Sequence, residues 1–217
     1  LTQDAMLSAL HAFCAQGMQG YANSITPKKI YLDKSRGHIQ FAPFIREFYP
    51  DMKVICMVRD IRGCVASMEK KWRENPSVKD ARENPQQQSF VTVDMRANAY
   101  LNDAPLGLAI RRLYDAIQTK QIKNMHIVKA EDLCQYPEVT MQKVYDYIEE
   151  PYYKLDYNKV KQVTVENDRI AAFGIYGDHK IREKVEPVVK DYKEILGSVL
   201  SNNIKVNHAW FYDYFGY

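Results

Sequence analysis

The sequence lacks several features that would define its class at once. No apolar run approaches the roughly 20 residues that a membrane-spanning helix needs. The 4 cysteines lie far apart without the spacing of a metal site, so we expect no bound metal and no need for an oxidising compartment. No Gly-x-x-x-x-Gly-Lys-[Ser/Thr] motif is present, which argues against a P-loop kinase. These absences favour a cytoplasmic protein without a membrane span.

The chain also lacks a large net charge. The net charge is +3, too small by itself to predict a nucleic-acid partner, although a local basic pocket for an anionic nucleotide would account for it. The chain has 217 residues, of which 46% are hydrophobic and 26% charged. That length is enough for a proper core, and we expect one domain spanning residues 1–217.

The most informative stretch of the chain is residues 54–67, Val-Ile-Cys-Met-Val-Arg-Asp-Ile-Arg-Gly-Cys-Val-Ala-Ser. Its first five residues are apolar and β-rich, as in a buried strand. Arg59 follows that strand, and Asp60 is a good N-cap for a helix. The apolar stripe of this helix leaves Gly63 and Ser67 together on another face, one turn apart. A strand thus delivers an arginine to its carboxyl end beside a helix, where open α/β sheets bind anions.

This Arg-x8-Ser unit resembles the 3′-phosphate-binding element of sulfotransferases that use 3′-phosphoadenosine 5′-phosphosulfate (PAPS). The resemblance implies that Arg59 and Ser67 clamp the 3′-phosphate, with Arg62 and Gly63 beside them. It also implies adenosine 3′,5′-bisphosphate as the product nucleotide. The structural alternative is that Arg59 pairs with a local carboxylate and Ser67 faces solvent.

A second polar cluster, Asp33-Lys34-Ser35-Arg36-Gly37-His38, follows a predicted strand and precedes a predicted helix. Sulfuryl transfer needs a base for the acceptor hydroxyl and cations for the leaving phosphate. The resemblance implies that Asp33 or His38 is the base and that Lys34 is the cation. The alternatives are a surface ion pair for Asp33-Lys34 and a backbone-bonded helix start for His38.

A third basic cluster lies at Gly177-Asp178-His179-Lys180-Ile181-Arg182, where we expect a long helix to begin near Lys180. Cations at a helix start are unfavourable unless an anion is present. The position resembles the basic segment that closes over the 3′-phosphate in sulfotransferases, which implies that Lys180 and Arg182 bind the nucleotide. A solvated charged turn is the alternative.

Strands alternate with helices along the chain, so we expect a mostly parallel sheet flanked by helices in three layers. The resemblance, which runs from about Lys29 to Arg182 and includes Ala130-Glu131-Asp132-Leu133, implies the P-loop-like sulfotransferase fold. The expected strands cover residues 29–33, 54–58 and 125–129. The expected helices cover residues 3–21 and 39–48 and begin at about residues 60, 103, 137 and 180.

The sulfotransferase loop for the 5′-phosphosulfate, a Pro-x-Ser-Gly-[Ser/Thr]-Thr-like turn, is not in this sequence. We therefore expect an N-terminally truncated domain that is catalytically incomplete alone, with an open edge beside the 54–58 strand. The leading hypothesis is transfer from PAPS to a hydroxyl or amine of a small-molecule, glycan or peptide acceptor. The alternatives are a non-catalytic anion-binding relative and another nucleotide-dependent transferase. Residues 74–92 are a long polar loop suited to an acceptor pocket.

Overall fold

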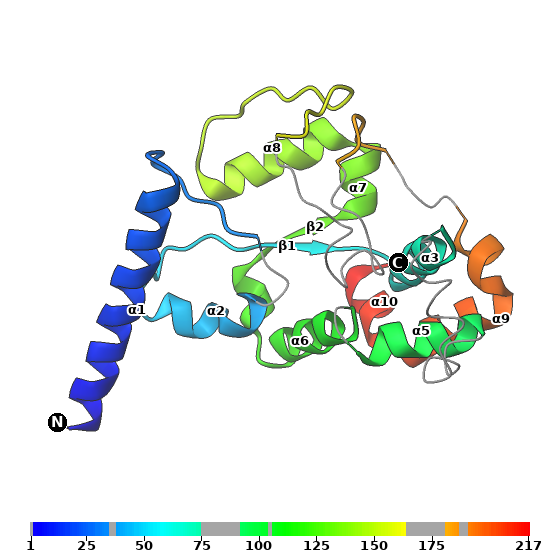
Figure 1. The fold of residues 1–217 in the computed structure, drawn as a ribbon, viewed down its shortest axis with the longest axis horizontal. Helices are drawn as coiled ribbons and strands as arrows, with labels where there is room; N and C mark the ends of the chain where they lie inside the picture. Colours follow the sequence, from blue (N-terminus) through cyan, green and yellow to red (C-terminus); the bar gives the residue numbers. More distant parts are fainter. Residues whose placement is uncertain (1, 35–37, 75–91, 104–105, 164–180, 187–190) are drawn as a thin grey trace.

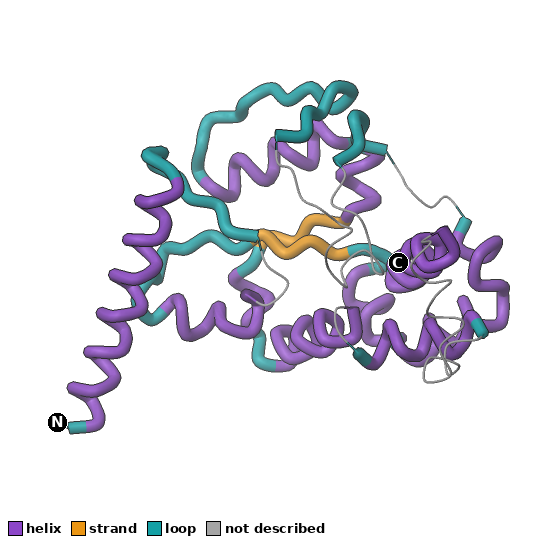
Figure 2. Tube along the Cα trace, in the orientation of Figure 1, coloured by secondary structure: helices purple, strands orange, loops and turns teal. Residues whose placement is uncertain are grey.

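The computed structural model describes the chain except for residues 1, 35–37, 75–91, 104–105, 164–180 and 187–190. The described part is mostly helical and contains a small parallel sheet (Figures 1 and 2). In chain order its elements are α1 (Gln3–Ile25), α2 (His38–Arg46), β1 (Ile55–Val58), α3 (Ile61–Glu74), α5 (Val93–Asn102), α6 (Leu106–Gln118), the 3-10 helix η2 (Gln121–Asn124), β2 (His126–Lys129), α7 (Ala130–Gln135), α8 (Pro137–Ile148), α9 (Tyr192–Asn207) and α10 (Ala209–Phe215).

β1 and β2 pair in parallel, with Ile55 opposite His126 and Val58 opposite Lys129. This confirms the strands predicted over residues 54–58 and 125–129. The predicted strand over residues 29–33 is wrong, because those residues are irregular. Within the described ranges the sheet has two parallel strands and the structure is mostly helical, so the expected three layers around a larger sheet are not seen there. The parallel pairing still places the residues after both strands at one edge.

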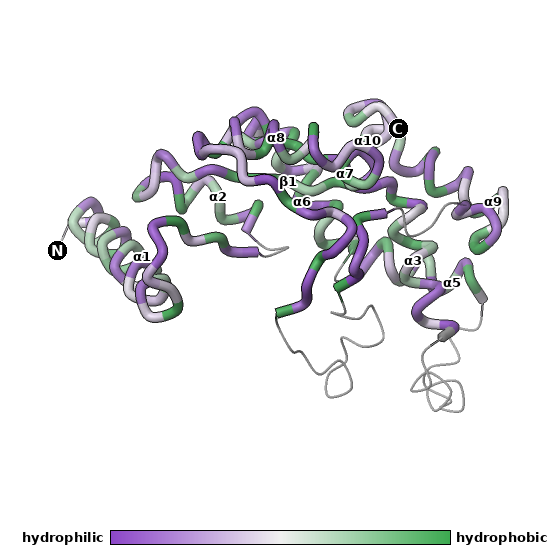
Figure 3. The backbone as a smooth tube through the Cα atoms, turned by 90° about the horizontal axis from the view of Figure 1, so that it is seen from above, coloured by the Kyte–Doolittle hydropathy of each residue, from purple (hydrophilic) through white to green (hydrophobic). Residues whose placement is uncertain are grey.

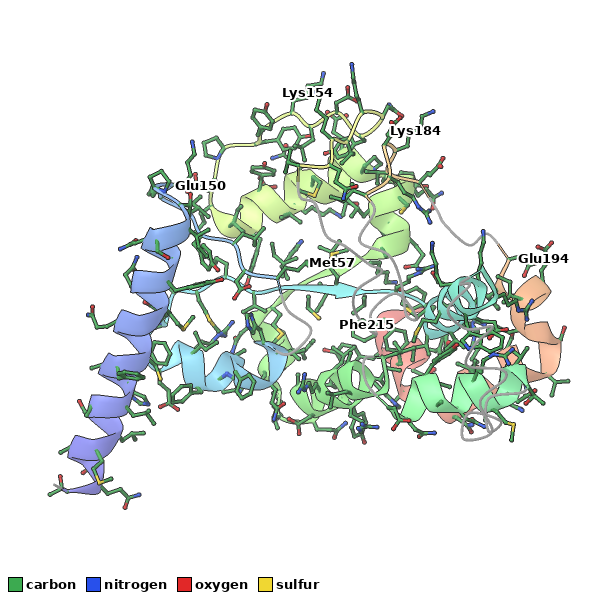
Figure 4. All side chains as sticks on the ribbon, viewed as in Figure 1. Met57, Glu150, Lys154, Lys184, Glu194 and Phe215 are labelled. Atoms are coloured by element: carbon green, nitrogen blue, oxygen red, sulfur yellow. The ribbon has the colours of Figure 1, made fainter. Side chains whose placement is uncertain are left out.

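One edge of β1 has no partner strand among the described residues, as expected for this strand. Met57, labelled on β1 in Figure 4, is 54% exposed despite lying in the middle of the sheet. Apolar surface is therefore accessible beside the strand that leads to Arg59.

The main core lies at the carboxyl end of β1. There α3 packs against α5 and α9, while α10 follows α9 and returns to the same end of the molecule (Figure 1). Ile61, Val65 and Met68 are buried, which confirms the predicted apolar stripe of α3. The aromatic C-terminal segment packs onto the same core, with Phe211 and Phe215 buried. The arginine-bearing strand end is thus held by the best-packed part of the protein.

The last long helix begins later than its apolar pattern predicts. Residues 181–186 are irregular, and α9 begins at Tyr192, where the Asp191 carboxylate caps it by accepting a hydrogen bond from the Lys193 amide at 2.7 Å. Gly197 lies inside α9 with a non-helical φ of 75°, so α9 consists of two helical parts joined by a kink at this glycine. Lys180 lies outside the described residues.

At the other end of the long axis, α1 projects from the body (Figures 1 and 3). It confirms the helix predicted over residues 3–21 and begins at Thr2, whose hydroxyl accepts a hydrogen bond from the Ala5 amide. Tyr49, which follows α2, donates a hydrogen bond to the Ala15 carbonyl at 2.9 Å. In the ranges that the structure describes, α1 and every other helix are too short or too polar to cross a membrane.

A buried ion network fixes α3 against α5. Glu69 on α3 is fully buried and accepts two hydrogen bonds from Arg96 on α5, each at 2.7 Å. Arg73 donates a third at 2.6 Å. The Arg96 guanidinium also lies 3.7 Å from the centre of the Trp72 ring. This network fixes the rotation of α3 about its axis and so the direction in which its polar face points.

We expect Glu69→Leu to lower the free energy of unfolding by about 3 kcal/mol, because it removes a buried carboxylate that accepts two hydrogen bonds from the buried Arg96. Urea denaturation followed by circular dichroism measures the loss. Glu149→Gln, which breaks the exposed ion pair between Glu149 and Lys53, is the control and should cost much less. Equal losses in the two variants would show that the buried network is not a main stabilising feature.

Candidate functional site

Arg59 leaves β1 at the carboxyl edge of the sheet and folds back onto the first turn of α3. A Cβ atom added at Gly63 would lie 3.4 Å from Nε and 3.5 Å from Nη2 of Arg59. The absence of a side chain at Gly63 therefore makes room for the guanidinium. Among the described residues, Arg59 makes no ion pair and no side-chain hydrogen bond. Its charge is not balanced by a local carboxylate, contrary to the structural alternative.

Ser67 lies one helical turn beyond Gly63, on the same face of α3. It is half-buried. Since Arg59 lies against Gly63, the guanidinium and the Ser67 hydroxyl share this face of the helix, near its positive N-terminal end. One cation and one hydroxyl therefore approach the same surface from a strand end and from a helix.

Arg62 has a different environment, because it is tied to Asp60. The Asp60 carboxylate accepts hydrogen bonds from Nε of Arg62 at 2.9 Å and from Nη2 at 2.5 Å. The guanidinium carbon lies 4.3 Å from the Tyr192 ring centre and 4.8 Å from that of Tyr212. Both side chains of the ion pair are 13% exposed. Arg62 lies only three positions after Arg59 in the sequence, yet its positive charge is already paired with the Asp60 carboxylate.

Asp60 also caps α3, as predicted, by accepting a hydrogen bond from the Arg62 amide at 2.9 Å. Its own amide donates to Oε1 of Glu131 at 3.0 Å. Glu131 lies on α7, which directly follows β2. Its carboxylate therefore links the end of β2 to the end of β1, at the Asp60 amide next to Arg59. This contact orients the turn from which the Arg59 side chain leaves the sheet.

The positive charge of Arg59 acts on the thiols of both Cys64 and Cys134, where it opposes the effect of burial on their pKa values. Burial raises the pKa of Cys64 to about 11, although the positive charge of Arg59 opposes the increase. Burial also raises the pKa of Cys134, and there the charges of both Arg59 and Arg182 act in the opposite direction. Arg182 therefore lies near the same thiol as Arg59, although 123 positions separate them in the chain. Both positive charges therefore act on one thiol at the carboxyl edge of the sheet.

The predicted catalytic cluster forms a pair of its own. Nε2 of His38, the first residue of α2, lies 3.6 Å from Oδ2 of Asp33, and both side chains are half-exposed. Lys34 is exposed in the same coil. Within the described residues, no hydrogen bond or ion pair joins this cluster to Arg59 or Ser67.

Sequence reasoning missed the part of the site that comes from the C-terminus. The Tyr212 hydroxyl donates to Oδ1 of Asp60 at 3.1 Å, and the Tyr217 hydroxyl donates to Oε2 of Glu131 at 2.7 Å. The available signal was the aromatic run from Trp210 to Tyr217, which predicted packing but gave no partners. These phenols lie around the Arg59 turn and complete its hydrogen bonding.

The pKa of Asp60 predicts how this turn responds to acid. Burial alone would raise it, but hydrogen bonds from the Arg62 side chain and backbone outweigh burial and hold the pKa below its ordinary value of 3.8. A folded-state pKa below the unfolded one stabilises the protein above pH 3.8, and this stabilisation is lost as the pH falls through the folded value.

We therefore expect Asp60→Asn to be less stable than the wild type at pH 7, and the difference to shrink as the pH falls below 3.8. Denaturant unfolding at a series of pH values measures it. Asp213→Asn, at an exposed aspartate of α10, is the control and should match the wild type throughout. A deficit of Asp60→Asn that stays constant down to pH 3 would contradict this assignment.

Comparison with known proteins identifies the family. The model of the sulfotransferase family matches residues 2–154, a span that includes β1, Arg59, Ser67 and the Asp33–His38 pair. No curated protein and no solved structure matches the chain significantly. The matched span covers well over half of the chain and contains the strand–arginine–helix unit described above. The protein belongs to the sulfotransferase family.

Proposed function

We propose that the protein transfers a sulfuryl group from PAPS to a hydroxyl or amine acceptor, and that Arg59 and Ser67 bind the 3′-phosphate. The observation that carries the proposal is the state of Arg59. Arg59 stands at the carboxyl end of a parallel strand, in a chain that belongs to the sulfotransferase family. It has no anionic partner among the described residues. A phosphate would supply that partner.

The surroundings of Arg59 suit a phosphate group. A guanidinium presents paired N–H donors that match two phosphate oxygens, and Ser67 adds a hydroxyl donor from the same helix face. Gly63 lets the Arg59 guanidinium lie directly against this face of α3. Arg182, near Cys134, adds a second cation on the side of α7. We assign Arg62 to holding Asp60 and not to the ligand, because its guanidinium is already paired.

PAPS supplies the activated sulfuryl group, and the chain's own residues manage protons and charge around it. We assign Asp33 as the base that accepts the proton of the acceptor hydroxyl. His38, 3.6 Å away, is positioned to orient this carboxylate or to take over its role. The ammonium of Lys34 would offset negative charge on the leaving phosphate. Lys180 and residues 75–91, assigned to the nucleotide and to the acceptor, lie outside the described residues.

Arg59→Ala should weaken adenosine 3′,5′-bisphosphate binding by ~1.5–3 kcal/mol, or about 10- to 150-fold, because it removes a charge-assisted contact. The melting temperature without ligand should change little, since Arg59 has no ion pair to lose among the residues that the structure describes. Isothermal titration and thermal shift measure the two effects.

Two controls make this test specific for the 3′-phosphate. Adenosine 5′-monophosphate lacks that phosphate and should bind Arg59→Ala as well as it binds the wild type. Arg111→Ala removes an exposed arginine of α6 that donates to the Asn102 carbonyl, and it should leave bisphosphate binding unchanged. If Arg59→Ala weakened both nucleotides equally, the assignment of Arg59 to the 3′-phosphate would be wrong.

In an enzyme that also carries a 5′-phosphosulfate loop, Asp33→Asn should reduce sulfuryl transfer at least 100-fold while leaving bisphosphate affinity within about twofold, because general base catalysis typically contributes 10²- to 10⁴-fold. Transfer of labelled sulfate from PAPS to a panel of phenols, sugars, amines and peptides measures turnover. His38→Gln is the matched comparison. Full turnover in Asp33→Asn with loss in His38→Gln would move the base to His38, and nucleotide binding without transfer even in an enzyme that carries the 5′-phosphosulfate loop would favour a non-catalytic anion-binding relative.

A further inference from the structure

Two carboxylates lie close to Arg59, and each is occupied by another donor. Asp60 is paired with Arg62. Glu131 accepts the Asp60 amide with Oε1 and the Tyr217 hydroxyl with Oε2. Both of its oxygens are therefore used, although its charge and that of Arg59 act on the same two thiols, Cys64 and Cys134. Glu131 is thus bonded to two neutral donors and, among the described residues, makes no ion pair with Arg59.

Tyr217 is well fixed for this task. Its ring stacks on Phe211 with the planes 11° apart and the centres 5.5 Å apart. The Lys129 ammonium, at the end of β2, lies 4.9 Å from the centre of the Tyr217 ring. Burial and the hydrogen bond to Glu131 raise the pKa of the phenol, so it stays protonated and donates at neutral pH. The donor to Glu131 is therefore rigid and permanently available.

We propose that Tyr217 is a positioning residue that holds the Glu131 carboxylate away from Arg59 and so keeps the arginine available for an anionic ligand. Without the phenol hydroxyl, Oε2 of Glu131 loses its only side-chain donor in the described structure. The Arg59 guanidinium, which has no ion pair among the described residues and acts on the same two thiols as Glu131, is then a cation with which it can pair. An internal Arg59–Glu131 pair would compete directly with a phosphate. The inference rests on the proposed binding of a phosphate at Arg59.

Comparing variants with a charged and with a neutral side chain at position 131 separates this role of Tyr217 from a purely structural one. Tyr217→Phe leaves Glu131 charged and free to compete. Tyr217→Phe combined with Glu131→Gln removes the same hydroxyl but leaves a neutral amide, which cannot form an ion pair with a guanidinium. If Tyr217 served packing alone, the double variant would bind a ligand no better than the single one.

The test is isothermal titration of adenosine 3′,5′-bisphosphate into the full chain and its variants, with circular dichroism to confirm folding. We expect Tyr217→Phe to bind about tenfold more weakly than the wild type, as one competing ion pair would cause. Glu131→Gln should bind as well as the wild type or a few fold more tightly. The double variant should recover to within about threefold of the wild type. Tyr214→Phe, at an exposed tyrosine of α10, is the control and should bind normally.

Each contrary result has a definite meaning. Wild-type affinity in Tyr217→Phe, or a double variant as weak as Tyr217→Phe, would overturn the role of Tyr217 while leaving phosphate binding at Arg59 intact. No binding by the wild type would overturn the proposed function, and this inference with it. If Tyr217→Phe failed to fold, Glu131→Gln alone would decide, because a marked loss of affinity would show that the Glu131 charge supports the site and does not compete for it.

Discussion

The hydrogen bonds of Asp60 are the interaction on which the rest of this site depends. Its carboxylate caps α3, pairs with Arg62 and accepts the Tyr212 hydroxyl, while its amide donates to Glu131. One residue therefore joins the end of β1 to α3, α7 and α10. Because Arg59 directly precedes it, every contact of Asp60 also limits where the Arg59 side chain can go.

The buried network around Glu69 extends this control to the far end of α3. Glu69 holds the helix against α5 through Arg96, and Arg73 reaches the Ile195 carbonyl on α9. A helix that is fixed at both ends cannot turn Gly63 and Ser67 away from the strand end. Burying these charges costs free energy. The network that they form fixes the direction of the α3 face that carries Gly63 and Ser67.

Local patterns predicted the strand, the capped helix and the Gly63–Ser67 face, since neighbouring residues determine them. Residues 29–33 have the apolar pattern of a strand, yet a strand needs a partner for its backbone groups, and among the described residues none pairs with them. The helix predicted from Lys180 failed because Asp191 caps a later start. The contacts that sequence reasoning missed join Asp60 to Glu131, 71 positions away, and to Tyr212, 152 positions away. Such distant partners leave no local pattern in a single sequence.

These contacts also give the Arg-Asp-x-Arg turn a physical meaning. An aspartate beside a ligand-binding arginine would ordinarily neutralise it, and the site would then bind anions poorly. Here Arg62, on the first turn of α3, pairs with Asp60 bidentately, and the Tyr192 and Tyr212 rings shield this pair from water. The second arginine thus balances the acid that caps the helix, and the first has no ion pair among the described residues.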